Sequence, residues 1–561
     1  MWTTSINKLS GYAIMVSIAI TIIQIELSYS EPITLAQRIR NMVRSRSLES
    51  STGLISTQTD LDPIAIKGYK FFNSRTGENV LIKGIDYYPR PNAGDLDVNS
   101  VDYFTEEHRH IWERDIPQFQ ALGVNAIRLY SVDPDQDHAA FMCALSKAGI
   151  YVLVELASGA CPKCAILSSE APHCYPRQLK TRGEAVIYEF SKYSNTLAFS
   201  AGNEVNHYTM NHPPQWNAPC LKKFVRDMRA YVSKCDHIRH VPVGLIMADS
   251  DRDENTLYYN CQSGDDDLDH AEWYGINTYV YCNGTADSFD EAVGFNKLIQ
   301  SFETYNYSIP VMLTEYGCLS KSFPTIDGYQ GQRNFNQAKW LGMKSVQDEF
   351  AGGFAFEYSI EKSNARTPFP FKEFGEQNYG VGYLSPDQCD DVSIMCEYNR
   401  TPTFDALKKA YSLAHADNIT MDEFEPDKSR SGRTTCPAHF PKLNSFHWIA
   451  DWQRSLSCPD RTQDTWTCPA DGVPNSVTTE SQINGWTLMF TLFGFIGIIY
   501  AIMKFFTNMQ EIHTHSSLSP NIWNVEKNAS CNVTEESNGL IVNSNQFGSG
   551  YLSVTSRSSS E

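Results

Sequence analysis

Short apolar runs alternate with amphipathic stretches between about residues 78 and 417. Most of the runs are almost continuously apolar where they begin, which is typical of strands that are covered on both faces. This pattern predicts eight strands: VLIKGIDYY (80–88), VNAIRLYSV (124–132), IYVLVELAS (150–158), TLAFSAGNEV (196–205), VPVGLIMAD (241–249), EWYGINTYV (272–280), IPVMLTEYG (309–317) and GGFAFEYS (352–359).

The segments between these runs have apolar positions at helical spacing. Gly123 and Gly149 follow two of the predicted helices and are typical helix-ending residues, and Thr401 is placed to cap the last one. Eight strands that alternate with helices predict an α/β fold, the (β/α)8 or TIM barrel. An open doubly wound sheet is the alternative, but no GxGxxG motif follows the first strand. The predicted helices cover 110–123, 138–149, 218–235, 289–305, 332–350 and 401–417.

Polar side chains collect at the carboxyl ends of the strands, where barrel enzymes carry their active sites. Glu204 ends the fourth strand directly after Asn203, and Glu315 ends the seventh. In a barrel these ends face each other across the mouth. A retaining glycosidase needs two such carboxyl groups, one as nucleophile and one as acid and base, and Asn203 would bond the sugar 2-hydroxyl. The other polar or aromatic side chains at strand ends are Asp86, Tyr88, Arg128, Tyr130, Glu155, Tyr279, Glu357 and Tyr358.

Three of these segments, FSAGNEV, WYGINTYVYC and TEYGC, resemble the β-1,3-glucanosyltransferases of glycoside hydrolase family 72, which are cell-surface enzymes of fungal walls. KGIDYY, ERDIPQFQALGVNAIRLYSVDPDQDH and AGGFAFEYS resemble further segments of the family in the same order, so the resemblance covers about residues 62–415. It implies that Glu204 is the acid/base and Glu315 the nucleophile. It also implies that Asn203 and Tyr279 contact the donor sugar, that Tyr130 lines the donor cleft, and that Arg128 supports Glu315 as a buried cation.

The resemblance further implies a disulfide between Cys282 and Cys318, which would fix Tyr279 relative to Glu315. The chain also departs from the family pattern. Tyr88 stands where the family usually has Gln, and Glu155 where it commonly has Asp. Trp112 occupies an early cysteine position, and Cys143 is offset from its usual partner. These changes affect the predicted substrate-contacting wall, to which Tyr358 is also assigned; ordinary packing at the barrel mouth is the alternative for the tyrosines.

The predicted reaction is cleavage of a β-1,3-glucan donor and transfer to the 3-hydroxyl of a second glucan, the acceptor. It requires neither a metal nor an organic cofactor. A hydrolase on the same barrel is one alternative, and an inactive glycan-binding surface protein is another. The net charge of −19 and a pI near 5.2 argue against a nucleic-acid partner.

The ends of the chain predict a secreted, membrane-anchored protein. Residues 1–30 resemble a signal peptide, residues 31–61 a linker or pro-segment, and residues 62–417 the barrel. Residues 418–484 form a cysteine-containing stalk, WTLMFTLFGFIGIIYAIM lies in a transmembrane helix over 485–506, and residues 507–561 form a disordered cytoplasmic tail.

Fourteen cysteines precede the predicted span, an even number that suggests disulfides on the extracellular side of the plasma membrane. Their pairing does not follow from spacing. Cys161 and Cys164 form a CxxC motif without a second pair, which favours structural thiols over a zinc site. Four sequons agree with an extracellular catalytic domain: Asn283, Asn306, Asn399 and Asn418.

Overall fold

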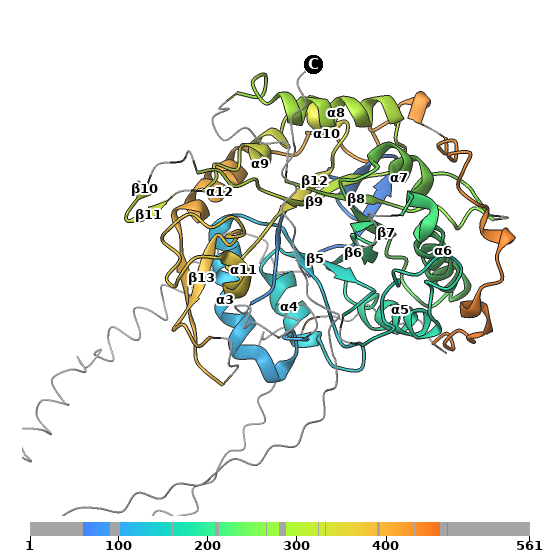
Figure 1. The fold of residues 1–561 in the computed structure, drawn as a ribbon, viewed down its shortest axis with the longest axis horizontal. Helices are drawn as coiled ribbons and strands as arrows, with labels where there is room; N and C mark the ends of the chain where they lie inside the picture. The colour runs from blue at the N-terminus through green and yellow to red at the C-terminus, as the bar shows by residue number, and fades with distance from the viewer. Residues whose placement is uncertain are drawn as a thin grey trace, which may run out of the picture. The chain divides into compact units, whose positions relative to one another are not determined.

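A closed barrel of eight parallel strands forms the centre of the computed structural model (Figure 1). The structure describes residues 60–89, 101–159, 161–207, 212–264, 266–279, 288–321, 323, 325–330, 332–389, 393–430, 432–459 and 468. The barrel closes where the last strand pairs in parallel with the first. In barrel order the strands are β3 (Ile82–Asp86), β4 (Ala126–Leu129), β5 (Tyr151–Glu155), β6 (Thr196–Asn203), β7 (Val243–Ala248), β8 (Tyr274–Thr278), β9 (Val311–Tyr316) and β12 (Gly352–Ala355).

Each barrel strand lies inside one of the eight predicted segments, so the predicted fold class is confirmed. The apolar runs are buried because the strands face the barrel interior on one side and the surrounding helices on the other. The helices are α3 (Arg109–Leu122), α4 (Ala139–Lys147), α5 (Arg177–Phe190), α6 (Ala218–Lys234), α7 (Arg252–Tyr259), α8 (Val293–Tyr305), α9 (Asn336–Trp340), α10 (Lys344–Gln347), α11 (Lys362–Ala365) and α12 (Pro402–Leu413).

Two helix predictions need correction. The single helix predicted over 332–350 is divided into α9 and α10. Gly342, between them, packs so closely on Ala414 that a side chain there would collide with backbone. Thr401 does precede α12, but its side chain does not cap the helix. The Thr401 hydroxyl donates instead to the carbonyl of Val381 at 2.9 Å.

Helix α5 was not predicted, and Gly183 near its centre explains why. A Cβ at this position would lie 2.5 Å from the sulfur of Met228 and 2.7 Å from the ring of Phe224, both on α6. Glycine therefore allows α5 and α6 to pack closely, although it is a poor helix former and weakens the helical pattern in the sequence.

Short hairpins lie at both ends of the barrel. Strands β1 (Ile64–Lys67) and β2 (Lys70–Asn73) pair in front of the first barrel strand, and Ile64 and Phe71 pack with residues at the amino ends of the barrel strands. After β9 and β12 the chain forms β10 (Thr325–Ile326) with β11 (Tyr329–Gln330), and β13 (Gly382–Ser385) with β14 (Glu397–Arg400). The hairpins β10–β11 and β13–β14 belong to the loops on the side of the barrel that carries the predicted site.

The segment over residues 418–459, called the strap below, runs along the outside of the barrel beside α6 (Figure 1). Two disulfides bind it there, Cys235–Cys458 and Cys261–Cys436, and Cys143–Cys468 adds a third beyond it. The described part of the predicted stalk is thus packed on the barrel. The other disulfides that the structure describes are Cys161–Cys164, Cys174–Cys220 and Cys389–Cys396.

Several sequence predictions fall outside the described ranges: the signal peptide, the linker before residue 60, the transmembrane helix over 485–506, the tail, and the residues Cys282 and Asn283. Within those ranges the helices are too short or too polar to cross a bilayer. Of the other sequons, Asn306 and Asn418 are exposed. Asn399 is partly buried, and its amide donates to the hydroxyl of Ser385 at 2.9 Å.

Candidate active site

Glu315, near the carboxyl end of β9, lies at the centre of the polar cluster in the barrel mouth. Its Oε1 accepts hydrogen bonds from Nη1 of Arg128 at 2.9 Å and from the hydroxyl of Tyr130 at 3.1 Å. Its Oε2 accepts one from the hydroxyl of Tyr279 at 2.5 Å. The side chain is 3% exposed. A buried carboxylate with three donors, one of them cationic, is well suited to carry negative charge.

Arg128, on β4, joins the two strand ends that the sequence singled out. While Nη1 donates to Glu315, Nη2 donates to the side-chain oxygen of Asn203 at 2.9 Å. The guanidinium is fully buried, and Nη1 also contacts Asp86 at 3.4 Å. The rigid guanidinium plane therefore fixes the position of Glu315 relative to Asn203.

Asn277, on β8, completes the connection to the second carboxyl group. Its amide nitrogen donates to Oε1 of Glu204 at 3.0 Å and to the side-chain oxygen of Asn203 at 3.1 Å. Its own oxygen accepts a hydrogen bond from the hydroxyl of Thr314 at 2.8 Å. Glu204, Asn203, Asn277, Arg128 and Glu315 thus form one continuous hydrogen-bonded network. Asn277 was missed by the sequence analysis, although it lies on β8, two residues before Tyr279, which directly follows the strand.

Glu204 lies where the chain turns out of β6, and its backbone is in the left-handed region with φ of 49°. This conformation is unfavourable for a residue with a Cβ and is common at functional sites. It is held by hydrogen bonds from Glu204 N to the carbonyl of Ile246 and from His207 N to the Glu204 carbonyl. Burial, together with the negative charge of Glu315, raises the pKa of Glu204 to about 7. The carboxyl group is therefore protonated at moderately acidic pH.

Further buried carboxyl groups surround Arg128. Burial raises the pKa of Glu155 to about 7, and neither of its oxygens has a hydrogen-bond partner among the described residues. Burial also raises the pKa of Asp86 and of Glu357 well above the ordinary value; nearby Arg128 opposes the effect at Asp86, while the charge of Glu361 adds to it at Glu357. The site therefore holds more acidic groups than Arg128 can neutralise.

Two tyrosines of the predicted substrate wall are buried. Tyr358 is fully buried between the barrel and α3, where its hydroxyl donates to Asp115 at 2.7 Å and its ring stacks on Tyr398. This placement contradicts its assignment to the substrate wall. Tyr88 is 3% exposed and packs edge-on against Tyr103.

A group of aromatic rings stands beside the carboxylates. The ring of Tyr279 lies 5.0 Å from that of Tyr379 and 6.0 Å from that of Phe356. Arg333 packs against this group, with its guanidinium 5.7 Å from the centre of the Tyr379 ring. The guanidinium also donates hydrogen bonds to the carbonyls of Gly317 and Phe356. Tyr379 comes from the loop after β12 and was not predicted. Cys318, which follows β9, is disulfide-bonded, but the predicted partner Cys282 is outside the described residues.

The site belongs to a chain with clear relatives. The 1,3-beta-glucanosyltransferase PGA4 of Candida albicans is 33% identical over 322 residues, which are 57% of this chain and 64% of that protein. The 1,3-beta-glucanosyltransferase gel1 of Aspergillus fumigatus is 31% identical over 359 residues, 64% of this chain and 67% of that protein. The matched part of the chain thus spans about two thirds of the length of these relatives.

A solved structure of Saccharomyces cerevisiae Gas2p in complex with laminaritriose and laminaritetraose superposes with a TM-score of 0.52 at 29% identity, covering 72% of this chain and 78% of that one. The sequence profile described as "Glucanosyltransferase" matches residues 54–366, more than half of the chain. This protein therefore belongs to the glucanosyltransferase family, glycoside hydrolase family 72.

Proposed function

We propose that this protein is a retaining β-1,3-glucanosyltransferase that remodels cell-wall glucan. The observation that carries the proposal is the double contact of Arg128, which holds Glu315 with one nitrogen and Asn203, the neighbour of Glu204, with the other. This contact brings the ends of β6 and β9 into one network, as a two-carboxylate mechanism requires. Relatives that bear the name 1,3-beta-glucanosyltransferase support the same conclusion.

In the first step, Glu315 attacks the anomeric carbon of a glucose unit in the donor chain. The bond from that carbon to the bridging oxygen breaks, and Glu204 gives its proton to this leaving oxygen. The opposed protonation states fit the surroundings of the two groups. Glu315 has three hydrogen-bond donors, whereas the pKa of Glu204 is raised to about 7.

In the second step, the 3-hydroxyl of an acceptor glucan attacks the same carbon. Glu204, now ionised, takes the hydroxyl proton, and the ester bond to Glu315 breaks, so that a new β-1,3 bond forms. The side-chain oxygen of Asn203 already accepts hydrogen bonds from Arg128 and Asn277. Its amide nitrogen is therefore the atom that Asn203 offers to the sugar 2-hydroxyl. The rings of Tyr279, Tyr379 and Phe356 supply an apolar wall that favours a sugar acceptor over water.

We further propose that the enzyme works outside the plasma membrane, anchored by the predicted C-terminal helix. The disulfides between the barrel and the strap, Cys235–Cys458 and Cys261–Cys436, support an oxidising compartment. The exposed sequon residues Asn306 and Asn418 agree with this location. Surface labelling of intact cells, before and after treatment with a glycosidase that removes N-linked glycans, tests both points.

The decisive experiment incubates the full chain with a single laminari-oligosaccharide and analyses the products by chromatography. Products longer than the donor are expected, because transfer adds the retained fragment to another chain. Products that are only shorter would make the protein a hydrolase. No product at all, with binding retained, would make it a glycan-binding protein.

A further inference from the structure

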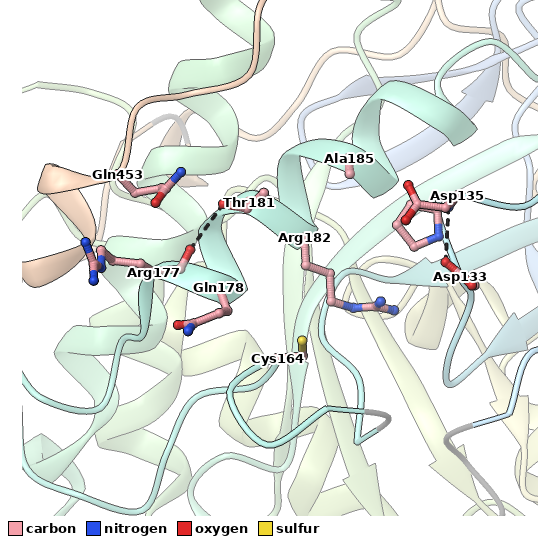
Figure 2. Close-up of a pocket in the computed structure, with 10 residues that line it drawn as sticks. Asp133, Asp135, Cys164, Arg177, Gln178, Thr181, Arg182, Ala185 and Gln453 are labelled. Atoms are coloured by element: carbon pink, nitrogen blue, oxygen red, sulfur yellow. Dashed lines mark hydrogen bonds between the residues drawn. The ribbon is translucent and has the colours of Figure 1, made fainter.

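A second cavity of about 550 Å³ lies on the flank of the barrel, against α5 (Figure 2). Its walls come from four parts of the chain: the loop after β4, the loop after β5, the first turns of α5, and the strap. The volume is within the range of small-ligand sites. The polar side chains that matter for its chemistry are Asp133, Asp135, Arg177, Gln178, Arg182 and Gln453.

The cavity lining combines opposite charges with neutral hydrogen-bonding groups. Arg177 and Arg182 lie on the α5 side, and Asp133 and Asp135 lie on the opposite wall (Figure 2). The two cations and two carboxylates balance, so the lining does not select for a charged ligand. Among the described residues that line the cavity none is aromatic. Such a surface fits a neutral ligand with many hydroxyl groups, which donate to carboxylates and accept from guanidinium and amide groups.

Arg182 is the residue that most needs a partner. Its Nη2 donates to the carbonyl of Val132 at 2.5 Å, but its Nε is buried and has no hydrogen-bond partner among the described residues. Figure 2 shows the side chain extending from α5 into the space beside Cys164 and Asp133. Burial also lowers the pKa of Arg182, although Asp133 opposes this effect. The guanidinium is therefore only partly compensated and gains from a polar ligand.

The cavity is connected to the candidate active site through its wall. Val132, which accepts the Arg182 hydrogen bond, is two residues beyond Tyr130. Between them, the Ser131 hydroxyl is 2.6 Å from that of Ser158, and Ser158 N donates to the carbonyl of Cys164 in the cavity wall. Arg182 also acts electrostatically on Glu155, the buried carboxyl group near Arg128. The same two loops thus border the cavity and the barrel mouth.

We propose that this cavity is a distal subsite, which binds glucose units of the donor glucan several residues away from the bond that is cleaved. The inference rests on the proposed function for the identity of the chain. The loop after β4 carries both Tyr130, which bonds to Glu315, and the cavity residues Asp133 and Asp135, so a glucan chain that extends along this loop reaches the cavity. The strap forms part of the subsite through Gln453, so the segment after the barrel contributes to substrate binding.

The test compares laminaripentaose with a donor of twice its length. The double variant Arg177→Ala, Gln178→Ala removes two exposed side chains of the cavity wall. Neither side chain makes a hydrogen bond or an ion pair with another described residue, so the fold should persist. A second variant, Ala185→Trp, fills the cavity. In both variants the ratio of kcat/KM for the long donor to that for the short donor should fall about tenfold, the effect of losing roughly two hydrogen bonds. Lys408→Ala with Lys409→Ala, on α12, is the matched control and should keep the wild-type ratio.

Binding by the Glu315→Gln protein separates this inference from the proposed function. Isothermal titration with each oligosaccharide should show a tenfold advantage of the longer one, which the cavity variants abolish. If the enzyme makes no transfer products, the proposed function fails, and this titration still decides the subsite. Cavity variants that keep the full preference for the long chain in both measurements would overturn the inference.

Discussion

Asn277 donates one amide group to both Glu204 and Asn203, at 3.0 and 3.1 Å. Because Thr314 donates to the oxygen of Asn277, the amide is held with its nitrogen toward the carboxyl group. A nitrogen donor at this position stabilises the ionised form of Glu204 and opposes the rise in its pKa. Asn277 is thus a positioning residue that also lowers the pKa of Glu204.

We expect Asn277→Ala to lower kcat/KM for transfer by about tenfold to a hundredfold, through the loss of charge-assisted hydrogen bonds in the network. It should also shift the basic limb of the pH–rate profile upward, because the hydrogen bond that lowers the pKa of Glu204 is lost. Asn206→Ala is the control, since this amide bonds to Ala248 and Ser250. If the basic limb of the Asn277→Ala profile lies at the same pH as in the wild-type enzyme, Asn277 acts only on the fold.

The pH dependence of the wild-type enzyme follows from the two carboxyl groups. Glu204 must be protonated and Glu315 ionised in the free enzyme, so kcat/KM should follow a bell-shaped curve. The pKa of Glu204 is about 7, so activity should decline as the pH rises above about 7. Initial transfer rates over a buffer series measure this decline, and a flat profile from about pH 4 to 8 would contradict the assignment.

The barrel could be predicted from the sequence because its strands are buried on both faces. Runs such as IPVMLTEYG therefore stay apolar until the polar residue at the carboxyl end, which marks the active-site side. Glu204 and Glu315 were found in this way. Helix α5 was missed because Gly183 serves packing against α6 rather than helix formation. Here the tertiary contact outweighs the local preference.

The side chains beyond the strand ends were harder to assign. Glu357 and Tyr358 are adjacent beyond the end of β12, but they have different surroundings. Glu357 interacts with the charges of Asp86 and Glu315, while Tyr358 stacks on Tyr398. Asn277 escaped prediction for another reason. Polar residues inside a strand usually indicate a solvent face, whereas here the amide points into a network built from β4, β6 and β9.

The raised pKa of Glu204 should also be visible in stability. A carboxyl group whose pKa is higher in the folded state favours folding while it is protonated, and this contribution disappears as the pH rises from about 4.5 to about 7. Glu204→Gln does not ionise, so its stability relative to wild type should increase over this range, by at least about 1 kcal/mol. Thermal unfolding at several pH values measures the difference.

Glu315→Gln should lower turnover by about 10⁴-fold or more, because an amide cannot form the glycosyl-enzyme bond. Binding of laminari-oligosaccharides should remain, since the side chain keeps its volume and Arg128 and Tyr279 stay in place. Chromatography of the products and a binding titration give the two readings. Glu397→Gln, at an exposed position of β14, is the control and should retain activity. Residual transfer near the wild-type rate would remove Glu315 from the mechanism.

The disulfides that hold the strap should contribute more to stability than the short CxxC bridge. Cross-linking lowers the entropy of the unfolded chain by an amount that grows with the loop it closes. With Cys235–Cys458 intact, Cys261–Cys436 closes a loop of about 50 residues, for which about 4 kcal/mol is expected, against about 2 kcal/mol for Cys161–Cys164. The double alanine variants of these two pairs should therefore differ by about 2 kcal/mol in denaturant unfolding, monitored by tryptophan fluorescence. Equal losses would mean that the strap is held by its packing and ion pairs, such as Lys223–Asp451, rather than by the covalent link.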